Sequence, residues 1–175
     1  ERFVILDKNK KRSFKNIISS VKKIEKKLKF KISKNQDVIE YSPLGVEYIK
    51  KIAKKINVKK GGLLIIDYGY KGEKMKDTLK AVRNHNVTNV LEQIGNTDIT
   101  YNLNFSVIKK IIKNLKLKCQ GITTQRNFLI NLGIEKRAEI ISKNLPFSKK
   151  ADIYYRLNRL INKKQMGDLF KVMLI

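Results

Sequence analysis

The chain has 175 residues with a mass of 20.4 kDa, and 42% of the residues are hydrophobic, which fits one globular domain with an ordinary core. Its apolar runs are far shorter than the roughly 20 residues that a membrane-spanning helix needs. Its N-terminus carries no apolar signal segment, so we expect neither membrane insertion nor secretion. The single cysteine, Cys119, excludes an internal disulfide and has no second thiol nearby for a metal site. We therefore expect a reducing compartment such as the cytoplasm, and no bound metal.

The net charge of +25 at neutral pH is typical of a protein that binds nucleic acid or another polyanion. Only 7 of the 40 basic residues are arginine, however, and the lysines are scattered over every segment of the chain. Arginine forks and stacked aromatic rings, with which proteins read bases or single strands, are not gathered in one stripe. We therefore interpret the charge as a lysine bias of solvent-facing positions. A basic nucleic-acid-binding module is the alternative function.

The first segment predicts a β-hairpin, because the apolar stretches "RFVIL" and "SFKNII" flank the turn-forming residues 7–12. A short helix over 21–28 and an extended segment at "DVIEY" follow. Ser42 stands at an N-cap position before Pro43, and apolar residues recur at helical spacing after it. These features predict a long helix that ends at the Lys-Lys-Gly-Gly sequence of residues 59–62.

The uninterrupted apolar run "LLII" predicts a strand that is covered on both faces, as in a parallel α/β sheet. Asp67 is then expected at the carboxyl end of the strand, where open α/β sheets bind ligands. Asp67, Tyr68 and Gly69 therefore form a candidate site rim. A turn in which the Asp67 carboxylate caps local N–H groups is the alternative interpretation. His85 is a candidate general base, although a lone histidine is more often a hydrogen-bonded structural residue.

The next segment is polar and contains Asp98 and Thr100. Apolar residues from Phe105 to Leu115 then recur at helical spacing and predict a helix. The stretch "LKCQGIT", which follows it, is typical of a strand.

Helices dominate the remaining residues. Thr124 and Gly133 are expected to cap a short helix at its two ends. Further helices are predicted over 135–143 and 151–161, and "DLFKVMLI" predicts a last strand. The sequence contains no repeats and no linker rich in Gly, Ser or Pro, so we expect a single domain over 1–175.

Several separated motifs carry a resemblance to a known family. The segments "LIIDYG", "DTLKAVRNH", "DIT…NF", "GITTQRNFLINLGIEKRA" and "RLNRL…QMGDLFKVMLI" resemble, in order and spacing, the second half of the MidA-like methyltransferases. That family includes the mitochondrial assembly factor for respiratory complex I. Because "RFV" and "EYSP" also have counterparts in the family, the resemblance covers essentially the whole chain.

The resemblance implies an α/β fold with a seven-stranded, Rossmann-like sheet that uses S-adenosylmethionine. "LLIID", "LKCQGIT" and "DLFKVMLI" would be strands five, six and seven, which lie in the sheet as five, seven, six with strand seven antiparallel. The resemblance also implies symmetric dimethylation of an arginine on a complex I subunit. For eukaryotic relatives, the expected compartment is the mitochondrial matrix.

The chain departs from the family where the cofactor is expected to bind. No G-x-G sequence occurs among its nine glycines, and we expect the glycine-rich turn after strand one and the acidic residue after strand two to precede this chain. The chain is therefore expected to be the C-terminal half of a methyltransferase, without its cofactor-binding half. Asn102 and Asn104 also stand where relatives commonly have His and Asp.

What remains of the site is implied by the resemblance to line its substrate side. Asp67 and His85 are the candidate catalytic residues, because a carboxylate can hold a guanidinium group and accept a proton. The candidate substrate-binding residues are polar side chains and one glycine on the same motifs: Tyr68, Gly69, Asp77, Thr78, Arg83, Asp98, Thr100 and Gln125.

Three accounts of the chain stay open at this point. It is a fragment of a longer enzyme, one half of a split enzyme that assembles with a separate N-terminal chain, or a remnant that has lost activity. Salt-sensitive binding of DNA or RNA would instead favour the basic nucleic-acid-binding module.

Overall fold

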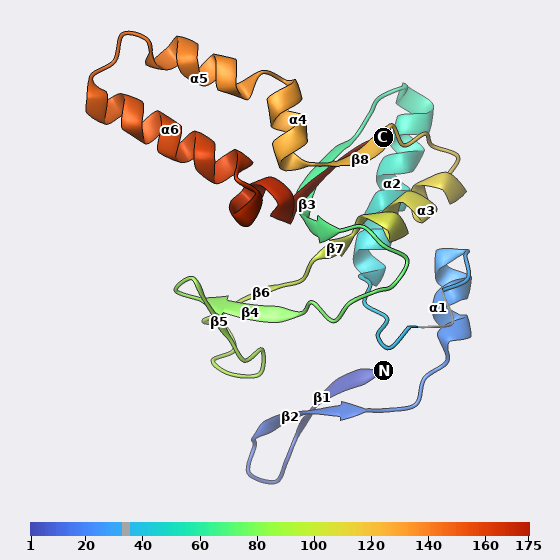
Figure 1. The fold of residues 1–175 in the computed structure, drawn as a ribbon. Coiled ribbons are helices and arrows are strands. Elements are labelled where there is room, and N and C mark those ends of the chain that lie inside the picture. Colours follow the sequence, from blue (N-terminus) through green and yellow to red (C-terminus); the bar gives the residue numbers. More distant parts are fainter. Residues whose placement is uncertain (33–35) are drawn as a thin grey trace. The chain divides into compact units, whose positions relative to one another are not determined.

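The computed structural model describes residues 1–32 and 36–175, which form two compact units (Figure 1). The first unit combines residues 1–41 with residues 74–101, and the second combines residues 42–73 with residues 102–175. The chain therefore passes from one unit to the other three times. Single-domain organisation over 1–175 stays a prediction, because compact units of this kind can belong to one folding domain.

The first unit begins with the predicted hairpin. Strands β1 (Arg2–Leu6) and β2 (Arg12–Asn16) pair in antiparallel register. The turn is held by Asp7, whose carboxylate Oδ1 accepts the backbone N–H groups of Asn9 at 2.9 Å and Lys11 at 2.8 Å. An aspartate that bonds to the backbone two residues further on is the usual way to stabilise such a turn. The sequence prediction of a hairpin is confirmed.

The rest of the first unit consists of one helix and a small sheet. Helix α1 (Val21–Leu28) has the predicted bounds. Strands β4 (Lys80–Arg83), β5 (Asn86–Thr88) and β6 (Asp98–Thr100) form an antiparallel sheet in the order β5-β4-β6, which the sequence analysis did not predict. The extended segment that was expected at "DVIEY" does not form a strand, because residues 37–41 use their side chains in irregular contacts described below.

The second unit begins with the long predicted helix, α2 (Pro43–Lys59). The Ser42 hydroxyl accepts the backbone N–H of Gly45 at 3.0 Å, and Pro43 occupies the first turn, where its missing N–H costs nothing. Lys60 ends the helix in the left-handed conformation, with φ of 57°. The predicted cap and the predicted end of this helix are both confirmed.

Replacing Ser42 by alanine is expected to lower the free energy of unfolding by about 1 kcal/mol, because one N–H group of the first turn loses its acceptor. Urea unfolding followed by circular dichroism measures the change. Ser42→Asp serves as the control, since aspartate caps equally well and should leave stability within about 0.5 kcal/mol of the wild type. Equal stability of the alanine and aspartate variants would contradict the assigned capping role.

The second unit contains a four-stranded sheet in the order β7-β3-β9-β8. Its strands are β3 (Leu64–Tyr70), β7 (Leu103–Asn104), β8 (Gly121–Thr124) and β9 (Phe170–Leu174). The last strand in the chain, β9, lies between β3 and β8 and is antiparallel to both. This is the order that the resemblance implies for the three predicted strands. The strand expected at "LKCQGIT" begins later than predicted, since regular pairing with β9 starts at Gly121.

Two expectations for β3 are wrong. Asp67 lies in the middle of β3 and not at its carboxyl end, because pairing with β9 continues to Tyr68 and pairing with β7 continues to Tyr70. The strand is also not covered on both faces. Leu64, Ile66 and Tyr68 are 45%, 43% and 41% exposed, whereas the alternate residue Ile65 packs on the core. The uninterrupted apolar run thus belongs to a strand that has one uncovered face. The apolar run alone does not show whether one face or both faces of a strand are covered.

The core of the second unit lies on the other face of the sheet. Helix α3 (Phe105–Asn114) follows β7 directly and packs Phe105, Ile108 and Ile112 against Met173 of β9. Figure 1 shows α2 and α3 together to the right of this sheet. The apolar spacing that predicted α3 therefore marks its buried face.

Helices α4 (Gln125–Asn131), α5 (Ile134–Ser142) and α6 (Phe147–Ile161) extend from the sheet on its left in Figure 1. The predicted caps of α4 are confirmed, since the Thr124 hydroxyl accepts the N–H of Asn127 and Gly133 adopts φ of 78°. Helix α6 begins four residues before the predicted Ala151, directly after Pro146, which fixes the entry of the helix. A short π-helical turn, η1 (Lys163–Gly167), leads into β9.

No helix within residues 1–32 and 36–175 has both the length and the apolar character that crossing a membrane requires.

Candidate functional site

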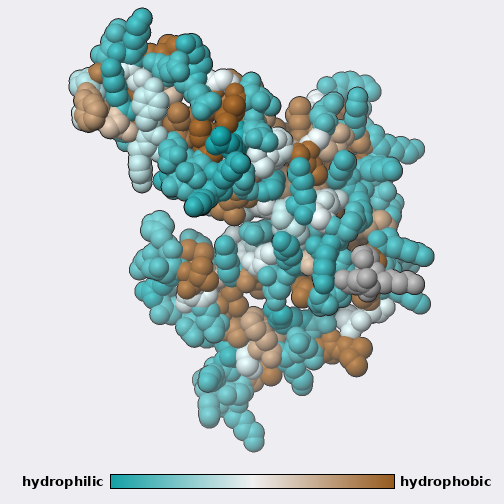
Figure 2. Space-filling model, in the orientation of Figure 1, coloured by the Kyte–Doolittle hydropathy of each residue, from teal (hydrophilic) through white to brown (hydrophobic). Residues whose placement is uncertain are grey.

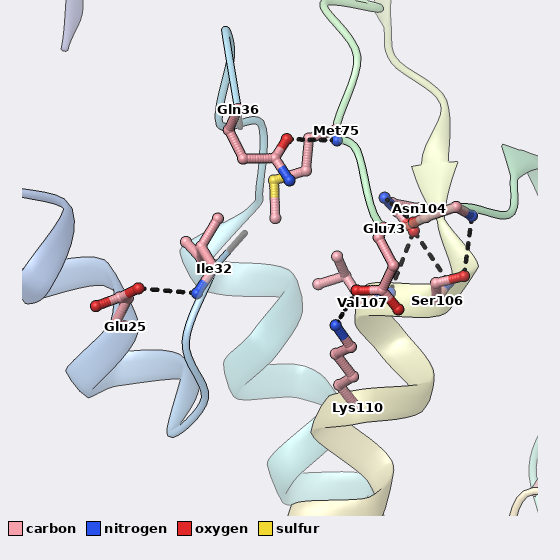
Figure 3. A network of polar contacts seen from close by, with 10 residues as sticks. Glu25, Ile32, Gln36, Glu73, Met75, Asn104, Ser106, Val107 and Lys110 are labelled. Atoms are coloured by element: carbon pink, nitrogen blue, oxygen red, sulfur yellow. Dashed lines mark hydrogen bonds and ion pairs between the residues drawn. The ribbon is translucent and has the colours of Figure 1, made fainter. Parts of the chain in front are cut away.

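In the first unit, the segment 74–78 is fastened to the segment 36–40 by side chains. The Gln36 carbonyl Oε1 accepts the backbone N–H of Met75 at 2.7 Å (Figure 3). The Asp37 carboxylate pairs with the Lys74 ammonium at 2.6 Å, and this hydrogen bond and charge lower the pKa of Asp37 below its ordinary value. Together these contacts fix the loop before β4 to the segment 36–40.

The predicted site residues Asp77 and Thr78 lie on this fastened loop. The Glu40 carboxylate accepts both the backbone N–H of Thr78, at 3.2 Å, and its hydroxyl group. Asp77 forms an ion pair of 2.9 Å with Arg2 of β1, in which both side chains are more than two fifths exposed. The structure therefore gives each of these two residues a partner within the unit. Their predicted contact with a substrate stays a prediction.

Sequence reasoning did not single out Gln36, Asp37 or Glu40. A signal was present, because Glu40 belongs to "EYSP", one of the stretches that carry the family resemblance. The importance of Glu40 was missed because residues 37–41 were expected to form an extended segment, in which side chains alternate between two faces. In the structure these side chains instead replace strand pairing as the acceptors for the loop at 74–78.

Arg83 and Asp98 come together on the small sheet. They line an open hollow of about 430 Å³ with Val82, Asn84 and Asn96. The hollow offers one carboxylate, one guanidinium group and two amides, so it can form hydrogen bonds with a polar ligand of either charge. It is open to water, which weakens each such interaction relative to a closed site.

His85 lies at the tip of the β4–β5 hairpin. The two residues of its turn, Asn84 and His85, have φ of 48° and 64°, which is the combination that a type I′ turn requires. The side chain of His85 is exposed. The backbone conformation therefore gives this position a structural role, and its predicted role as a general base stays a prediction. Thr100 lies on β6 opposite Lys80, with its side chain half-buried.

In the second unit, Asp67, Tyr68 and Gly69 follow one another along β3. The Asp67 carboxylate Oδ1 accepts the backbone N–H of Tyr68 at 2.7 Å, so it caps a local N–H group, but it does so within strand β3 and not in the turn that the alternative interpretation expected. The Tyr68 ring stacks on the ring of Phe170 of β9, with centroids 4.2 Å apart. Asp67 stands opposite Lys171 in the antiparallel register. Burial lowers the pKa of the Lys171 ammonium, while the neighbouring Asp168 carboxylate raises it and Lys71 lowers it further.

Gly69 allows a close approach of two segments. A Cβ atom at this position would lie 2.5 Å from the carbonyl oxygen of Leu103 and 2.5 Å from the ring of Phe105. Real side chains do not approach this closely, so only glycine fits between β7 and the start of α3. The predicted site residue Gly69 therefore has a structural reason of its own.

Asn104 caps helix α3 (Figure 3). Its Oδ1 atom accepts the N–H groups of Ser106 at 3.0 Å and Val107 at 3.2 Å, as a carboxylate would. Its amide nitrogen also donates to the carbonyl oxygen of Gly72 at 3.2 Å, a bond that a carboxylate could not form. This amide therefore ties the segment after β3 to the start of α3. The ion pair between Glu73 and Lys110 connects the same two segments.

Gln125 is the most buried of the predicted site residues with a polar side chain, at 7% exposure. Its Nε2 amide donates to the carbonyl oxygen of Leu160 at 2.9 Å. The guanidinium group of the next residue, Arg126, donates to the carbonyl oxygen of Ile161 at 2.8 Å. These two bonds close the end of α6 onto the start of α4. A role of Gln125 in substrate binding stays a prediction.

The predicted site residues are therefore divided between the two units. Asp67, Tyr68, Gly69 and Gln125 belong to the second unit, and the other six belong to the first. Within the part of the chain that the structure describes, no group of three or more His, Cys, Asp or Glu side chains could hold a metal ion.

The sequence contains no G-x-G motif of the kind from which a cradle for S-adenosylmethionine is built. Such a cradle needs glycines whose backbone lies free beside a ligand. Gly69 and Gly167 do not meet this condition, because they are closely surrounded by Leu103, Phe105, Ile161 and Asn162 of this chain. We therefore derive no chemical step through the cofactor from these residues.

A sheet of mixed direction, with an antiparallel last strand between two parallel ones and helices beside it, places the chain in the mixed α/β class. Two solved structures from Burkholderia thailandensis share this fold, with TM-scores of 0.80 and 0.77 over 99% of this chain at 21% sequence identity. The second of them is described as a "likely methyl transferase" bound to S-adenosyl-homocysteine. The chain corresponds to 47% and 46% of their lengths.

The sequence comparison defines the family. A model described as "Putative S-adenosyl-L-methionine-dependent methyltransferase" matches residues 1–123. The chain belongs to this family, the MidA-like S-adenosylmethionine-dependent methyltransferases, as the sequence motifs predicted.

Several curated vertebrate relatives share one name. "Protein arginine methyltransferase NDUFAF7, mitochondrial" is 34% identical to this chain in Danio rerio, over 70% of the chain, and 34% identical in Xenopus tropicalis, over 78%. The human protein of that name is 29% identical over 77% of the chain. The matched part of this chain spans only about three tenths of these relatives, that is 29%, 31% and 30% of their lengths.

Proposed function

We propose that the chain is the C-terminal part of a protein arginine methyltransferase that uses S-adenosylmethionine. Membership of the methyltransferase family carries this proposal, and the name of the curated relatives supports arginine in a protein as the methyl acceptor. In this proposal the product is symmetric dimethylarginine on a subunit of respiratory complex I. The free Cys119 thiol is compatible with a reducing compartment. The named relatives are mitochondrial, and we propose the mitochondrial matrix for a eukaryotic chain and the cytoplasm otherwise.

The strand order supports the placement of this chain within the family fold. We assign β3, β8 and β9 to strands five, six and seven of the methyltransferase sheet. The supporting observation is that β9, the last of the three in sequence, lies between the other two and runs antiparallel to them.

The uncovered side of β3 supports a missing N-terminal half. On the edge away from β9, the described strands pair with β3 only at Gly69 and Tyr70, through β7. The edge from Leu64 to Tyr68 and the exposed side chains of Leu64 and Ile66 are therefore open to another polypeptide. The solved structures are about twice as long as this chain, so they contain enough further sequence to fill this place. We propose that this second half supplies the cofactor cradle.

The acidic residues of the chain suit a guanidinium substrate. A carboxylate can hold a guanidinium group through two parallel charged hydrogen bonds and can take a proton from it when the methyl group is transferred. We assign this role to Asp67, with His85 as an alternative base. We propose that the other named site residues position the acceptor chain. They lie on β3, on the loop at 74–78, on β4 and β6, and at the start of α4.

The chain alone is expected not to bind S-adenosylmethionine at micromolar concentrations, because the backbone donors of the cradle are absent from it. Titration calorimetry of residues 1–175 with the cofactor measures this directly. Adding the proposed N-terminal half, taken from the coding sequence upstream of Glu1, should restore both binding and arginine dimethylation. Saturable micromolar binding by the isolated chain would contradict the proposal.

The net charge of +25 favours one other candidate, a nucleic-acid-binding module. Such a module should bind DNA or RNA with an affinity that falls steeply with salt, because each neutralised phosphate releases a counterion. Tight salt-sensitive binding by the isolated chain, together with no activity after addition of the second half, would favour this candidate. An inactive remnant would show neither property.

A further inference from the structure

We propose that the tip of the α5–α6 helical hairpin, residues 140–150, binds the surface of membranes that contain anionic lipids. This hairpin tip comprises the end of α5, the connecting turn and the first turn of α6. Figure 1 shows it at the far end of the second unit from the four-stranded sheet. The inference concerns no residue of the proposed methyltransferase site and does not depend on the proposed activity.

The hairpin tip exposes large apolar side chains that the helices do not use for packing. Phe147 is 86% exposed, Ile140 is 65% exposed, and Ile141 and Leu145 are also exposed. The buried residues of α5 are the small Ala138 and Ser142, so the large side chains at its end point away from the helix contact. Figure 2 shows hydrophobic side chains, in brown, that interrupt the hydrophilic surface over these helices at the upper left.

The charges of the hairpin tip have one sign. Residues 140–150 contain Lys143, Lys149 and Lys150 and no aspartate or glutamate. Within the described residues these three lysines form no ion pair, whereas basic residues further along both helices do, as in the pairs Lys136–Glu139 and Arg156–Asp152. The positive charge of the tip is therefore available to a negatively charged partner.

Charge and shape together select a lipid surface as that partner. Two copies of the tip would bring like charges together, which opposes self-association through this surface. The turn is convex, with its residues from Lys143 to Lys149 all exposed, so it offers no groove for a peptide. Aromatic and aliphatic side chains surrounded by lysines, in contrast, suit the interface of an anionic bilayer, where the rings enter the headgroup layer and the ammonium groups meet phosphates.

The first experiment uses the absence of tryptophan from the chain, which makes a single introduced tryptophan a unique reporter. The variant Phe147→Trp is mixed with phosphatidylcholine vesicles that contain about one third phosphatidylglycerol. We expect a blue shift of the emission and quenching by brominated lipid chains. The matched control is Val58→Trp, at an exposed apolar position of α2, and its emission should not change. Unchanged emission of Phe147→Trp, or equal shifts in both variants, would overturn the proposal.

The second experiment separates the tip from the general charge of the protein by vesicle co-sedimentation. Phe147→Ser, and separately the triple change of Lys143, Lys149 and Lys150 to Gln, should each lower the partition coefficient at least about tenfold. The control is the triple change of Lys54, Lys55 and Lys59 on α2 to Gln, which removes the same charge from another exposed surface. This control should change the partition coefficient less than about twofold.

Equal losses from the two lysine triples would show that only overall charge matters and would overturn the proposal. The same holds if Phe147→Ser binds as the wild type does, or if the tip variants lose affinity for a single-stranded oligonucleotide and not for vesicles. Because Phe147 is almost fully exposed, its replacement should leave the melting temperature unchanged, and circular dichroism verifies this for every variant.

Discussion

Replacing Gly69 by alanine is expected to lower the free energy of unfolding by about 3 kcal/mol, which is a large fraction of the stability of a small domain. The added methyl group would lie 2.5 Å from the Leu103 carbonyl oxygen and from the Phe105 ring. Neither neighbour can move easily, since the first belongs to the backbone of β7 and the second is fully buried. Urea unfolding monitored by circular dichroism provides the measurement.

The matched control is Gly61→Ala, because a Cβ atom at Gly61 meets nothing within 4 Å. This change should leave stability within about 1 kcal/mol of the wild type, or raise it slightly by restricting the unfolded chain. Combining Gly69→Ala with Phe105→Leu tests the mechanism further, since the smaller side chain makes room on one of the two sides. A Gly69→Ala variant as stable as Gly61→Ala would contradict the close approach of β3, β7 and α3.

The second large effect concerns activity and is expected once the chain is joined with an N-terminal half. Asp67→Asn should lower the rate of arginine methylation about ten- to a hundredfold, because a charged hydrogen bond to the guanidinium group contributes roughly 1.5 to 3 kcal/mol. Stability should change little. The amide oxygen of asparagine can still accept the Tyr68 N–H that the Asp67 carboxylate accepts at 2.7 Å.

Asp67→Ala separates the two roles of this side chain, since it removes both the charge and the acceptor for Tyr68. If Asp67 acts only as a local cap, Asp67→Asn should retain activity and stability, while Asp67→Ala should lower the melting temperature with near-normal activity of the folded fraction. Initial rates with an arginine peptide and thermal unfolding of both variants decide between these roles. Full activity of Asp67→Asn would remove this residue from the proposed site.

Local signals predicted much of the secondary structure of the chain. The bounds of α1 and α2 were predicted correctly, and α3 to within a residue, because capping residues and helical spacing are properties of neighbouring residues. The hairpin of β1 and β2 was predicted for the same reason, since its turn is held by Asp7 alone. The order of β3, β9 and β8 is a non-local property and followed only from the family resemblance.

The small sheet was missed because its strands carry weak local signals. Strands β5 and β6 have three residues each, and β6 combines the polar Asp98 and Thr100 around one Ile. Such short segments become strands through pairing with β4, which cannot be recognised from neighbouring residues. The bonds from Gln36, Asp37 and Glu40 to the loop at 74–78 were missed for a similar reason, because they join residues nearly 40 positions apart.

The candidate site was predicted as a set of residues, while the structure reveals what several of them do locally. Gly69 makes room for Phe105, and Gln125 bonds to the end of α6. His85 adopts the positive φ that its hairpin turn requires. These structural tasks were not apparent from the sequence, because the partners lie far away along the chain. The experiments on Asp67 and on the joined enzyme test whether the predicted site also binds substrate.

The bonds of Gln125 and Arg126 to the carbonyl groups of Leu160 and Ile161 bring the two ends of residues 125–161 to one place. The three helices between them thus leave the sheet and return to it at a single point, as an inserted module would. Such a module can change in length and surface over evolution without disturbing the strands that it connects. The family match to residues 1–123 stops just before the module, whereas the similarity in fold continues over 99% of the chain. Shortening α5 and α6 by equal numbers of turns should therefore be tolerated by the sheet.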